Sequence, residues 1–175
     1  MKRLTPTGEM TLGPFFPREF AHGADDLTVL DGKAARGEII EIAGRVVQGD
    51  GKPLDNAVLE IWQASDAGRF DDPGFFGWGR TATDGNGVYR FRTVRPGASE
   101  GRAPHVNFLI LFSGLMRQLQ TVMFFEGEAR NQADPVFLVV DPARRDRLIA
   151  KKGKAGAWQF DIRTRGEGET PFFDD

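Results

Sequence analysis

The chain has 175 residues and no cysteine, and its 23 basic and 25 acidic side chains leave a formal net charge of −2. The length suits one domain with a substantial core, and the lack of cysteine excludes disulfides, thiolate metal sites and a cysteine nucleophile. The balanced charge excludes the basic surface of a nucleic-acid-binding domain.

The first residues include no apolar segment of the kind found in secretory signals. No stretch reaches the roughly 18 apolar residues of a membrane span. We therefore expect a soluble, cytoplasmic protein. Residues 1–36 show no clear periodicity and are expected to form an N-terminal arm, in which TLGPFFP (11–17) holds two phenylalanines between prolines. Exposed aromatic side chains indicate a segment that lies against another surface.

Residues 37–175 are expected to form the folded domain, built mainly of short strands. Runs of apolar and β-branched residues predict strands at 39–47, 57–63, 88–94, 105–112, 119–125, 136–140 and 157–164. The 22 glycines and 10 prolines of the chain fall largely between such runs, where turns need their dihedral angles. This pattern predicts an all-β protein, a β-sandwich.

Two other segments stand out from the strands. Residues 64–87 are expected to form a long loop, which in a compact domain is usually functional or part of an interface. One short helix is expected over 143–152, with Asp141 as its N-cap, Pro142 in the first position and Gly153 after its end.

Gly97, Ser99 and Gly101 match the G-x-S-x-G pattern of serine hydrolases. That motif requires a strand before the serine and a helix after it. The residues after Gly101 predict another strand, so this segment is expected to be a glycine-rich turn.

Metal chemistry in this chain depends on two histidines, His22 and His105, and on one tyrosine, Tyr89. His105 and Asn107 alternate along a predicted strand, so their side chains share one face. A histidine at Asn107 would give a pair suited to a metal, but the strand offers no carboxylate to complete a site. On residue types alone, a structural role for His105 is the simpler interpretation, with His22 on the surface and Tyr89 packed in a strand.

Several stretches together resemble the intradiol ring-cleavage dioxygenases: GRVVQGDGKPLDNAVLEIWQASDAGRF, GRTATDGNGVYRFRTVRPG, APHVNF and QFDIRTRGEGETPFFDD. The resemblance is colinear from TLGPFFP to the C-terminus. It implies a β-sandwich of the intradiol dioxygenase type with long loops. It also implies an activity in which a catechol is cleaved with O₂ to a muconate. Members of this family hold a non-haem ferric ion between two tyrosinates and two histidines, and phenolate oxygen suits this hard cation.

The resemblance assigns the four metal-ligand positions to Phe70, Ser99, His105 and Asn107, so only one ligand is retained. This loss is typical of the family's α-type chains, which form hetero-oligomers with an iron-bearing β-type chain. The resemblance therefore implies that this chain alone carries no catalytic residue and no metal, and that Fe(III) lies on a β-type partner. Independently of any alignment, a chain with one tyrosine cannot supply two tyrosinate ligands.

The resemblance further implies that the chain contributes to the partner's pocket for a small aromatic substrate. The matching positions in the arm are Thr11, Gly13, Pro14 and Phe15. Many α-type chains also carry an arginine for a substrate carboxylate at the position of Ser113. Serine cannot replace the bidentate bonds of arginine, although Arg117 would reach the same region if the turn folds back. The substituent on the substrate is therefore left open.

Two alternatives remain at this point. The chain could be a ligand-binding or carrier sandwich with no catalytic assembly, using the aromatic segment 70–78 as its ligand surface. It could also be a stand-alone enzyme with a different metal site at His105, which would need further ligands that the sequence does not offer.

Overall fold

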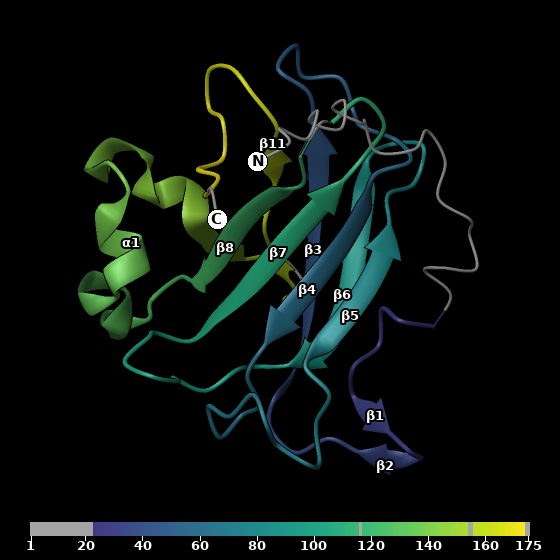
Figure 1. Ribbon diagram of the computed structural model, residues 1–175, viewed down its shortest axis with the longest axis vertical. Coiled ribbons are helices and arrows are strands. Elements are labelled where there is room, and N and C mark those ends of the chain that lie inside the picture. The colour runs from purple at the N-terminus through teal and green to yellow at the C-terminus, as the bar shows by residue number, and fades with distance from the viewer. Residues whose placement is uncertain (1–22, 116, 154–155, 174–175) are drawn as a thin grey trace, which may run out of the picture.

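The computed structural model describes residues 23–115, 117–153 and 156–173, and shows a β-sandwich (Figure 1). The strands are β1 (Val29–Leu30), β2 (Lys33–Ala34), β3 (Ile39–Val47), β4 (Val58–Gln63), β5 (Trp78–Ala82), β6 (Val88–Val94), β7 (His105–Leu111), β8 (Leu119–Phe125), β9 (Ile149–Lys152), β10 (Trp158–Gln159) and β11 (Ile162–Arg163). The helical segments are the 3₁₀ helix η2 (Ala129–Ala133), the α-helix α1 (Pro135–Val139) and the 3₁₀ helix η3 (Pro142–Leu148).

One layer of the sandwich has the strand order β5-β4-β7-β8, and all its neighbouring strands are antiparallel. In the other layer, β6 pairs along its whole length with β3, which also pairs with the short strands β10 and β11. Strand β9 joins the layers, because it pairs with both β8 and β10. The helical segments lie together beside β8, at one edge of the sandwich (Figure 1).

The core lies between the layers and is rich in aromatic rings. On β6, Tyr89 and Phe91 are buried while Arg90 and Arg92 are exposed, as the alternation of a strand with one solvated face requires. The ring of Phe108, on β7, lies 5.9 Å from that of Tyr89 and 6.2 Å from that of Phe91. Each such buried side chain contributes about 1.5–3 kcal/mol of hydrophobic stabilisation.

Most of the predicted strands are confirmed. Strands β3, β6 and β8 have the predicted bounds, and β4 and β7 differ from them by one residue. The turn at Gly97–Gly101 is also confirmed, because Ser99 and Arg102 pair across it and the chain then enters β7.

The prediction of a strand at 136–140 was wrong, since these residues lie largely in α1. The side chain of Asp134 accepts hydrogen bonds from the backbone N–H groups of Val136 and Phe137, and Pro135 occupies the first helical turn. A short apolar run does not by itself distinguish a strand from a buried helix. The Asp134 N-cap and Pro135 in the first turn favour the helix.

The prediction of a helix at 143–152 was also wrong. Asp141 does cap a helical segment, accepting from Ala143 N at 2.9 Å, but that segment is the 3₁₀ helix η3 and it ends at Leu148. Residues 149–152 form β9 instead, because pairing with β8 and β10 gives their backbone groups a ladder on both sides.

Two further boundaries differ from the prediction. The expected loop 64–87 contains β5, which pairs with β4 and extends the sheet. The single strand expected at 157–164 is divided into β10 and β11, which both pair with β3. Within the described ranges, no helix is long and apolar enough to cross a membrane.

Gly44, on β3, marks a point where two segments come close together. A Cβ atom at this position would lie 1.8 Å from the backbone oxygen of Phe160 and 2.9 Å from the ring of Tyr89. We therefore expect Gly44→Ala to lower the free energy of unfolding by about 3 kcal/mol in denaturant titrations. Gly85→Ala is the control, because nothing lies within 4 Å of a Cβ there. Equal stability of the two variants would contradict the close packing of β3.

Candidate functional site

Phe70 and Asn107, two of the positions assigned to metal ligands, meet at Trp62. The ring of Phe70 stacks on that of Trp62, with centroids 6.3 Å apart and planes at 14°. Trp62 and Asn107 are partners in the β4–β7 ladder, and the Asn107 side-chain amide donates to the Trp62 carbonyl at 3.2 Å. The fold therefore brings these two positions to one place, although they are distant in sequence.

His105 lies two residues before Asn107 on β7 and is almost fully buried, with 4% of its surface exposed. Its Nδ1 atom is 2.7 Å from the Ala103 carbonyl oxygen, and the centroid of its ring lies 6.2 Å from that of Phe124. A carbonyl only accepts, so Nδ1 carries the proton in this contact. Burial lowers the pKa of His105, while the hydrogen bond to Ala103 opposes that change. The folded chain therefore favours the neutral imidazole.

Because the pKa of His105 is lower in the folded chain than the value of about 6.5 in an unfolded one, the unfolded state binds the extra proton first. The free energy of unfolding is thus expected to decrease as the pH falls below about 6.5. His105→Gln should flatten this dependence in denaturant titrations between about pH 7.5 and pH 5.5. His22→Gln controls for the other histidine of the chain. An unchanged slope in His105→Gln would contradict a buried neutral His105.

Ser99 lies in a turn that packs against the segment leading to Phe70. Gly97 N donates to the Ser65 carbonyl at 2.9 Å, and a Cβ on Gly68 would lie 2.0 Å from the Ala98 oxygen. Ser99 is 5% exposed, and its hydroxyl oxygen has no hydrogen-bond partner among the described residues.

These positions do not form a site that fits a ferric ion. The Phe70 ring has no donor atom, the Asn107 amide is bound to a backbone carbonyl, and His105 is a single imidazole. Among the residues that the structure describes, no group of three or more histidine, cysteine, aspartate or glutamate side chains could hold a metal ion.

Tyr89, the only tyrosine of the chain, is also unsuited to metal binding. Its hydroxyl donates to the Phe160 carbonyl in the core, and its side chain is 1% exposed. Burial raises the pKa of Tyr89 well above its usual value, and the nearby Asp161 carboxylate adds to this effect. The phenolate form that a hard metal ion needs is therefore strongly disfavoured.

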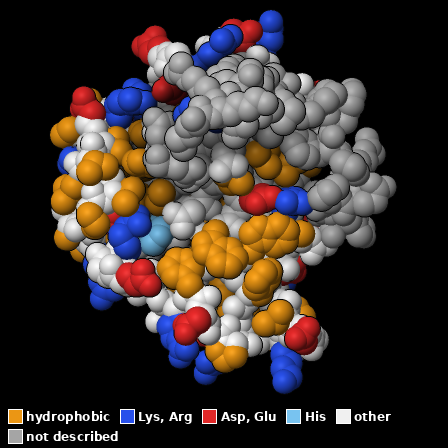
Figure 2. Space-filling model, viewed as in Figure 1, with side chains coloured by type: hydrophobic (Ala, Val, Ile, Leu, Met, Phe, Trp, Pro, Cys, Tyr) orange, Lys and Arg blue, Asp and Glu red, His pale blue; other side chains and the backbone are white. Residues whose placement is uncertain are grey.

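An exposed aromatic cluster surrounds Trp62 on the outer face of the sheet. We define the cluster as Trp62, Phe70, Phe76 and Trp78, which are linked by successive ring contacts with centroids 6.0–6.3 Å apart. Trp62, Phe70 and Phe76 expose 41%, 36% and 55% of their surface. Figure 2 shows hydrophobic side chains gathered over β4 and β5 on this face.

Beside the aromatic cluster, a cavity of about 250 Å³ opens over β4, β5 and β7. Glu60 lies at its edge and accepts hydrogen bonds from Trp78 Nε1 at 3.3 Å and from Arg80 Nε at 2.8 Å. The Arg80 guanidinium also lies over the Trp78 ring, 5.2 Å from its centroid. These contacts within the chain fix the orientation of Trp78, so this part of the cluster needs no partner protein to hold it in place.

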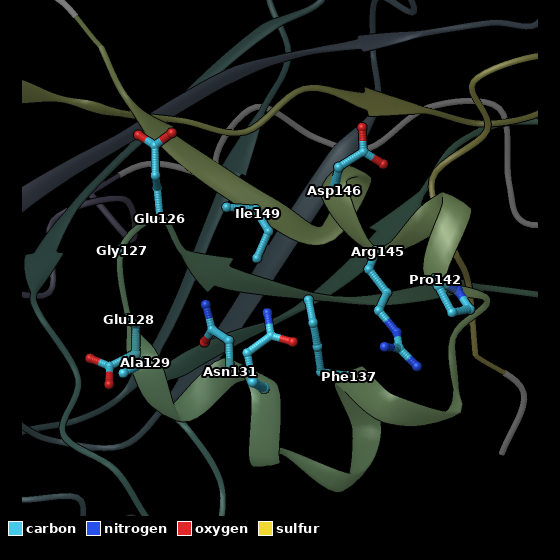
Figure 3. A pocket seen from close by; sticks show the side chains of 11 residues that line it. Glu126, Gly127, Glu128, Ala129, Asn131, Phe137, Pro142, Arg145, Asp146 and Ile149 are labelled. Carbon is cyan, nitrogen blue, oxygen red and sulfur yellow. The ribbon is translucent and has the colours of Figure 1, made fainter.

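Another cavity, of about 610 Å³, lies between η2, α1 and η3 (Figure 3), and none of the assigned ligand positions lines it. Its one arginine, Arg145, donates to the carbonyls of Leu138 and Val140 at 2.8 and 2.9 Å, so it caps the end of α1. In Figure 3 its guanidinium points away from Glu126. Arg145 is therefore engaged by the backbone of α1, and Glu128 of the cavity lining pairs instead with Arg95, at 3.6 Å.

The residues assigned to the partner's substrate pocket are placed only in part. Ser113 and Arg117 are both exposed, on the turn between β7 and β8. The remaining positions, together with His22, lie outside the described residues: Thr11, Gly13, Pro14 and Phe15.

The sequence analysis did not identify Asp134, which organises the region next to His105. Asp134 is fully buried and accepts hydrogen bonds from Arg102 Nε at 2.8 Å and Ala103 N at 2.9 Å, besides capping α1. Hydrogen bonds from Arg102 and the backbone outweigh the raising effect of burial, so the pKa of Asp134 is lowered. The sequence did contain a signal for this helix cap, namely an Asp-Pro pair before an apolar run. Asp141 and Pro142 form the same kind of pair at the start of η3.

The profile of a family described as Dioxygenase matches residues 11–166. The protocatechuate 3,4-dioxygenase alpha chain of Burkholderia cepacia is 35% identical over 196 residues, which cover 99% of this chain and 100% of that relative. The corresponding alpha chain of Pseudomonas putida is 40% identical over 157 residues, covering 80% and 78% of the two chains. The beta chain of Burkholderia cepacia is 36% identical over 183 residues, covering 86% of this chain and 78% of its own.

Solved structures share the fold. The dioxygenase domain of a dioxygenase carbohydrate-binding protein fusion from Streptomyces sp. SirexAA-E superposes with a TM-score of 0.64 at 28% identity, covering 91% of this chain and 97% of that chain. Hydroxyquinol 1,2-dioxygenase from Pseudomonas putida DLL-E4 gives a TM-score of 0.63 at 21% identity, covering 90% of this chain and 65% of its own, and supports the fold alone.

Proposed function

The chain belongs to the intradiol dioxygenase family, and we propose that it is the α-type, non-metal-binding subunit of a protocatechuate 3,4-dioxygenase, acting with an iron-bearing β-type subunit. The observation that carries this proposal is the substitution of the ligand positions. Phe70, Ser99 and Asn107 cannot replace two tyrosinates and a histidine, yet the sheet that would support such a site is intact.

Overall identity does not separate the two subunit types, because the chain matches an alpha chain at 35% and a beta chain at 36% in one organism. The residue types that are available as metal ligands do separate the two subunit types. A β-type role would need two tyrosines, and the chain has only Tyr89, whose hydroxyl is bound within the core. This supports the α-type role.

In this proposal, Fe(III) and the catechol lie on the β-type subunit, where O₂ cleaves the ring to a muconate. This chain contributes binding surface rather than a reacting group. Four residues of the N-terminal segment, together with the exposed turn that carries Ser113 and Arg117, would complete the pocket for the aromatic substrate: Thr11, Gly13, Pro14 and Phe15. Arg117 is the cation on this turn that would meet a carboxylate substituent.

The aromatic cluster supports a partner-dependent role. Trp62, Phe70 and Phe76 together expose an apolar surface next to the vacated ligand positions. Aromatic side chains of this kind are enriched at the centres of protein interfaces. We propose that the β-type subunit covers this cluster in the hetero-oligomer.

Co-purification with a β-type subunit tests the proposal. The complex is expected to consume O₂ with protocatechuate and to form the muconate product, whereas this chain alone is expected to be inactive. An iron-loaded, well-assembled complex that does not cleave the ring would contradict the proposal.

The second candidate function is a carrier or ligand-binding sandwich with no catalytic assembly. The cavity of about 250 Å³ beside the aromatic cluster favours this function, because the cavity is large enough for a small ring and its lining is mainly apolar. A chain that stays monomeric when mixed with β-type subunits, and binds catechols by itself, would favour this function over the subunit role.

A further inference from the structure

The segment just before β1, residues 24–28, closes one edge of the sandwich (Figure 1). Strand β5 is the end strand of one layer, β6 pairs with β3 alone among the described strands, and β5 and β6 lie next to each other. The Ala24 carbonyl accepts a hydrogen bond from Arg80 N on β5 at 2.9 Å. Leu27 N donates to the Arg92 carbonyl on β6 at 2.8 Å. The segment therefore bridges the two layers, and we refer to it as the strap.

Leu27 packs the strap into the core. Its side chain is 6% exposed and belongs to the hydrophobic cluster between the layers. Gly79, on β5, leaves the space that the strap occupies. A Cβ atom on Gly79 would lie 2.5 Å from Leu27 Cδ1 and 2.8 Å from the Ala24 carbonyl oxygen. The strap and β5 are therefore fitted to each other.

Asp26 ties the strap to β6 through its side chain. One carboxylate oxygen accepts from Thr28 N at 2.9 Å and from the Thr28 hydroxyl, and the other accepts from Arg92 Nη1 at 2.9 Å. Burial raises the pKa of Asp26, but the hydrogen bonds from Thr28 and Arg92 outweigh this effect and lower the pKa. The carboxylate is thus charged, which strengthens these bonds. Because 44% of the Asp26 side chain is exposed, its removal leaves no cavity in the core.

The strap begins beside the aromatic cluster. A small cavity of about 160 Å³ is lined by Gly23 and strap residues together with Phe76 and Trp78 of that cluster. The chain before Gly23 therefore starts next to the surface that we propose the β-type subunit covers.

The position of the strap sets how far the N-terminal segment can reach. Phe15 precedes Gly23 by eight residues, so it lies within about 29 Å of Gly23 even at full extension. If the strap were released, the next strand of the sandwich would be β3, which starts at Ile39, 24 residues after Phe15. The effective concentration of a tethered group falls roughly as the −3/2 power of tether length. A threefold longer tether therefore lowers it about fivefold.

We propose that the strap holds the end of the N-terminal segment beside the β-type partner, and that Asp26 is thereby a positioning residue for the partner's substrate pocket. This inference rests on the proposed subunit function, in which residues 11–15 complete that pocket. Asp26 touches no substrate and acts through the strap. Because residues 11–15 would bind the substrate without reacting, they would stabilise its ground state and transition state equally. Release of the strap should then raise KM and leave kcat unchanged.

Asp26→Ala in the full chain, assembled with a β-type subunit, tests this inference. Hydrogen–deuterium exchange followed by mass spectrometry is expected to be faster in peptides that cover residues 11–15 and 24–28 of the complex. KM for protocatechuate is expected to rise about fivefold at unchanged kcat. Asp26→Asn keeps an acceptor oxygen for Thr28 and should restore most of the parent behaviour.

Asp50→Ala is the matched control. Asp50 also accepts from a backbone N–H two residues later, Lys52 N at 3.1 Å, and pairs with the Lys52 ammonium at 3.1 Å. It lies outside the strap, so its variant should keep the parent exchange and KM.

Equal KM values for Asp26→Ala and Asp50→Ala in an active complex would overturn the inference, as would a lower kcat at unchanged KM. Unchanged exchange of residues 11–15 in Asp26→Ala would overturn it as well, and this readout requires no turnover. An assembled, iron-loaded parent complex that does not cleave the ring would instead contradict the proposed function, while the exchange readout still decides the inference. The two failures are therefore distinguishable.

Discussion

Asp134→Ala is expected to lower the free energy of unfolding by about 3–5 kcal/mol, because it removes one partner of a buried ion pair. The Arg102 guanidinium and the Ala103 N–H would lose their acceptor. The backbone N–H groups of Val136 and Phe137 would lose their cap as well. Denaturant titration followed by circular dichroism measures the change.

Asp141→Ala is the matched control for this variant. Asp141 also caps a helical segment next to a proline. However, it is exposed, and its side chain accepts a hydrogen bond from Ala143 N. We expect it to cost only about 1 kcal/mol. If the two variants are equally stable, the buried Asp134–Arg102 pair does not organise this region as described.

Trp62→Ala is expected to weaken assembly with the β-type subunit by about 2 kcal/mol or more, which is a loss of about 30-fold in affinity. Trp62 is at the centre of the aromatic cluster, in ring contact with both Phe70 and Phe76. Its side chain is on the outer face of β4, so its removal leaves no cavity in the core. The dissociation constant of the complex, measured by analytical ultracentrifugation, checks the change.

Val139→Ala provides the control for Trp62→Ala. Val139 is the most exposed large hydrophobic residue described, at 76%, and it lies on α1, away from the aromatic cluster. We expect this variant to assemble normally. Equal affinities of the two variants, with both chains folded, would place the partner on another surface.

The strands of the sandwich could be predicted from the sequence where their burial alternates. The β6 segment is such a case, since Tyr89 and Phe91 face the core while Arg90 and Arg92 face solvent. Prediction failed at 136–140 and 149–152, where the patterns are short. There the outcome depends on tertiary contacts, namely the cap from Asp134 and the ladders to β8 and β10.

The contacts of the candidate site could not be predicted from the sequence. The assignment of Phe70 and Asn107 to former metal-ligand positions stays a prediction, and the sequence did not indicate that both residues contact Trp62. It also gave no sign that Ser99 and Arg102 would each leave a buried polar group unpaired. Such contacts join segments far apart in the chain, and no local pattern encodes them.

The absence of a resident iron ion on this chain is the central claim, and metal analysis of the purified polypeptide tests it most directly. The full chain, produced alone in iron-supplemented cells, is expected to be colourless and to contain no stoichiometric iron, whereas its complex with a β-type subunit should contain iron. Stoichiometric iron in the chain alone would contradict the claim, because it would require a metal site that includes His105 and ligands other than Phe70, Ser99 and Asn107.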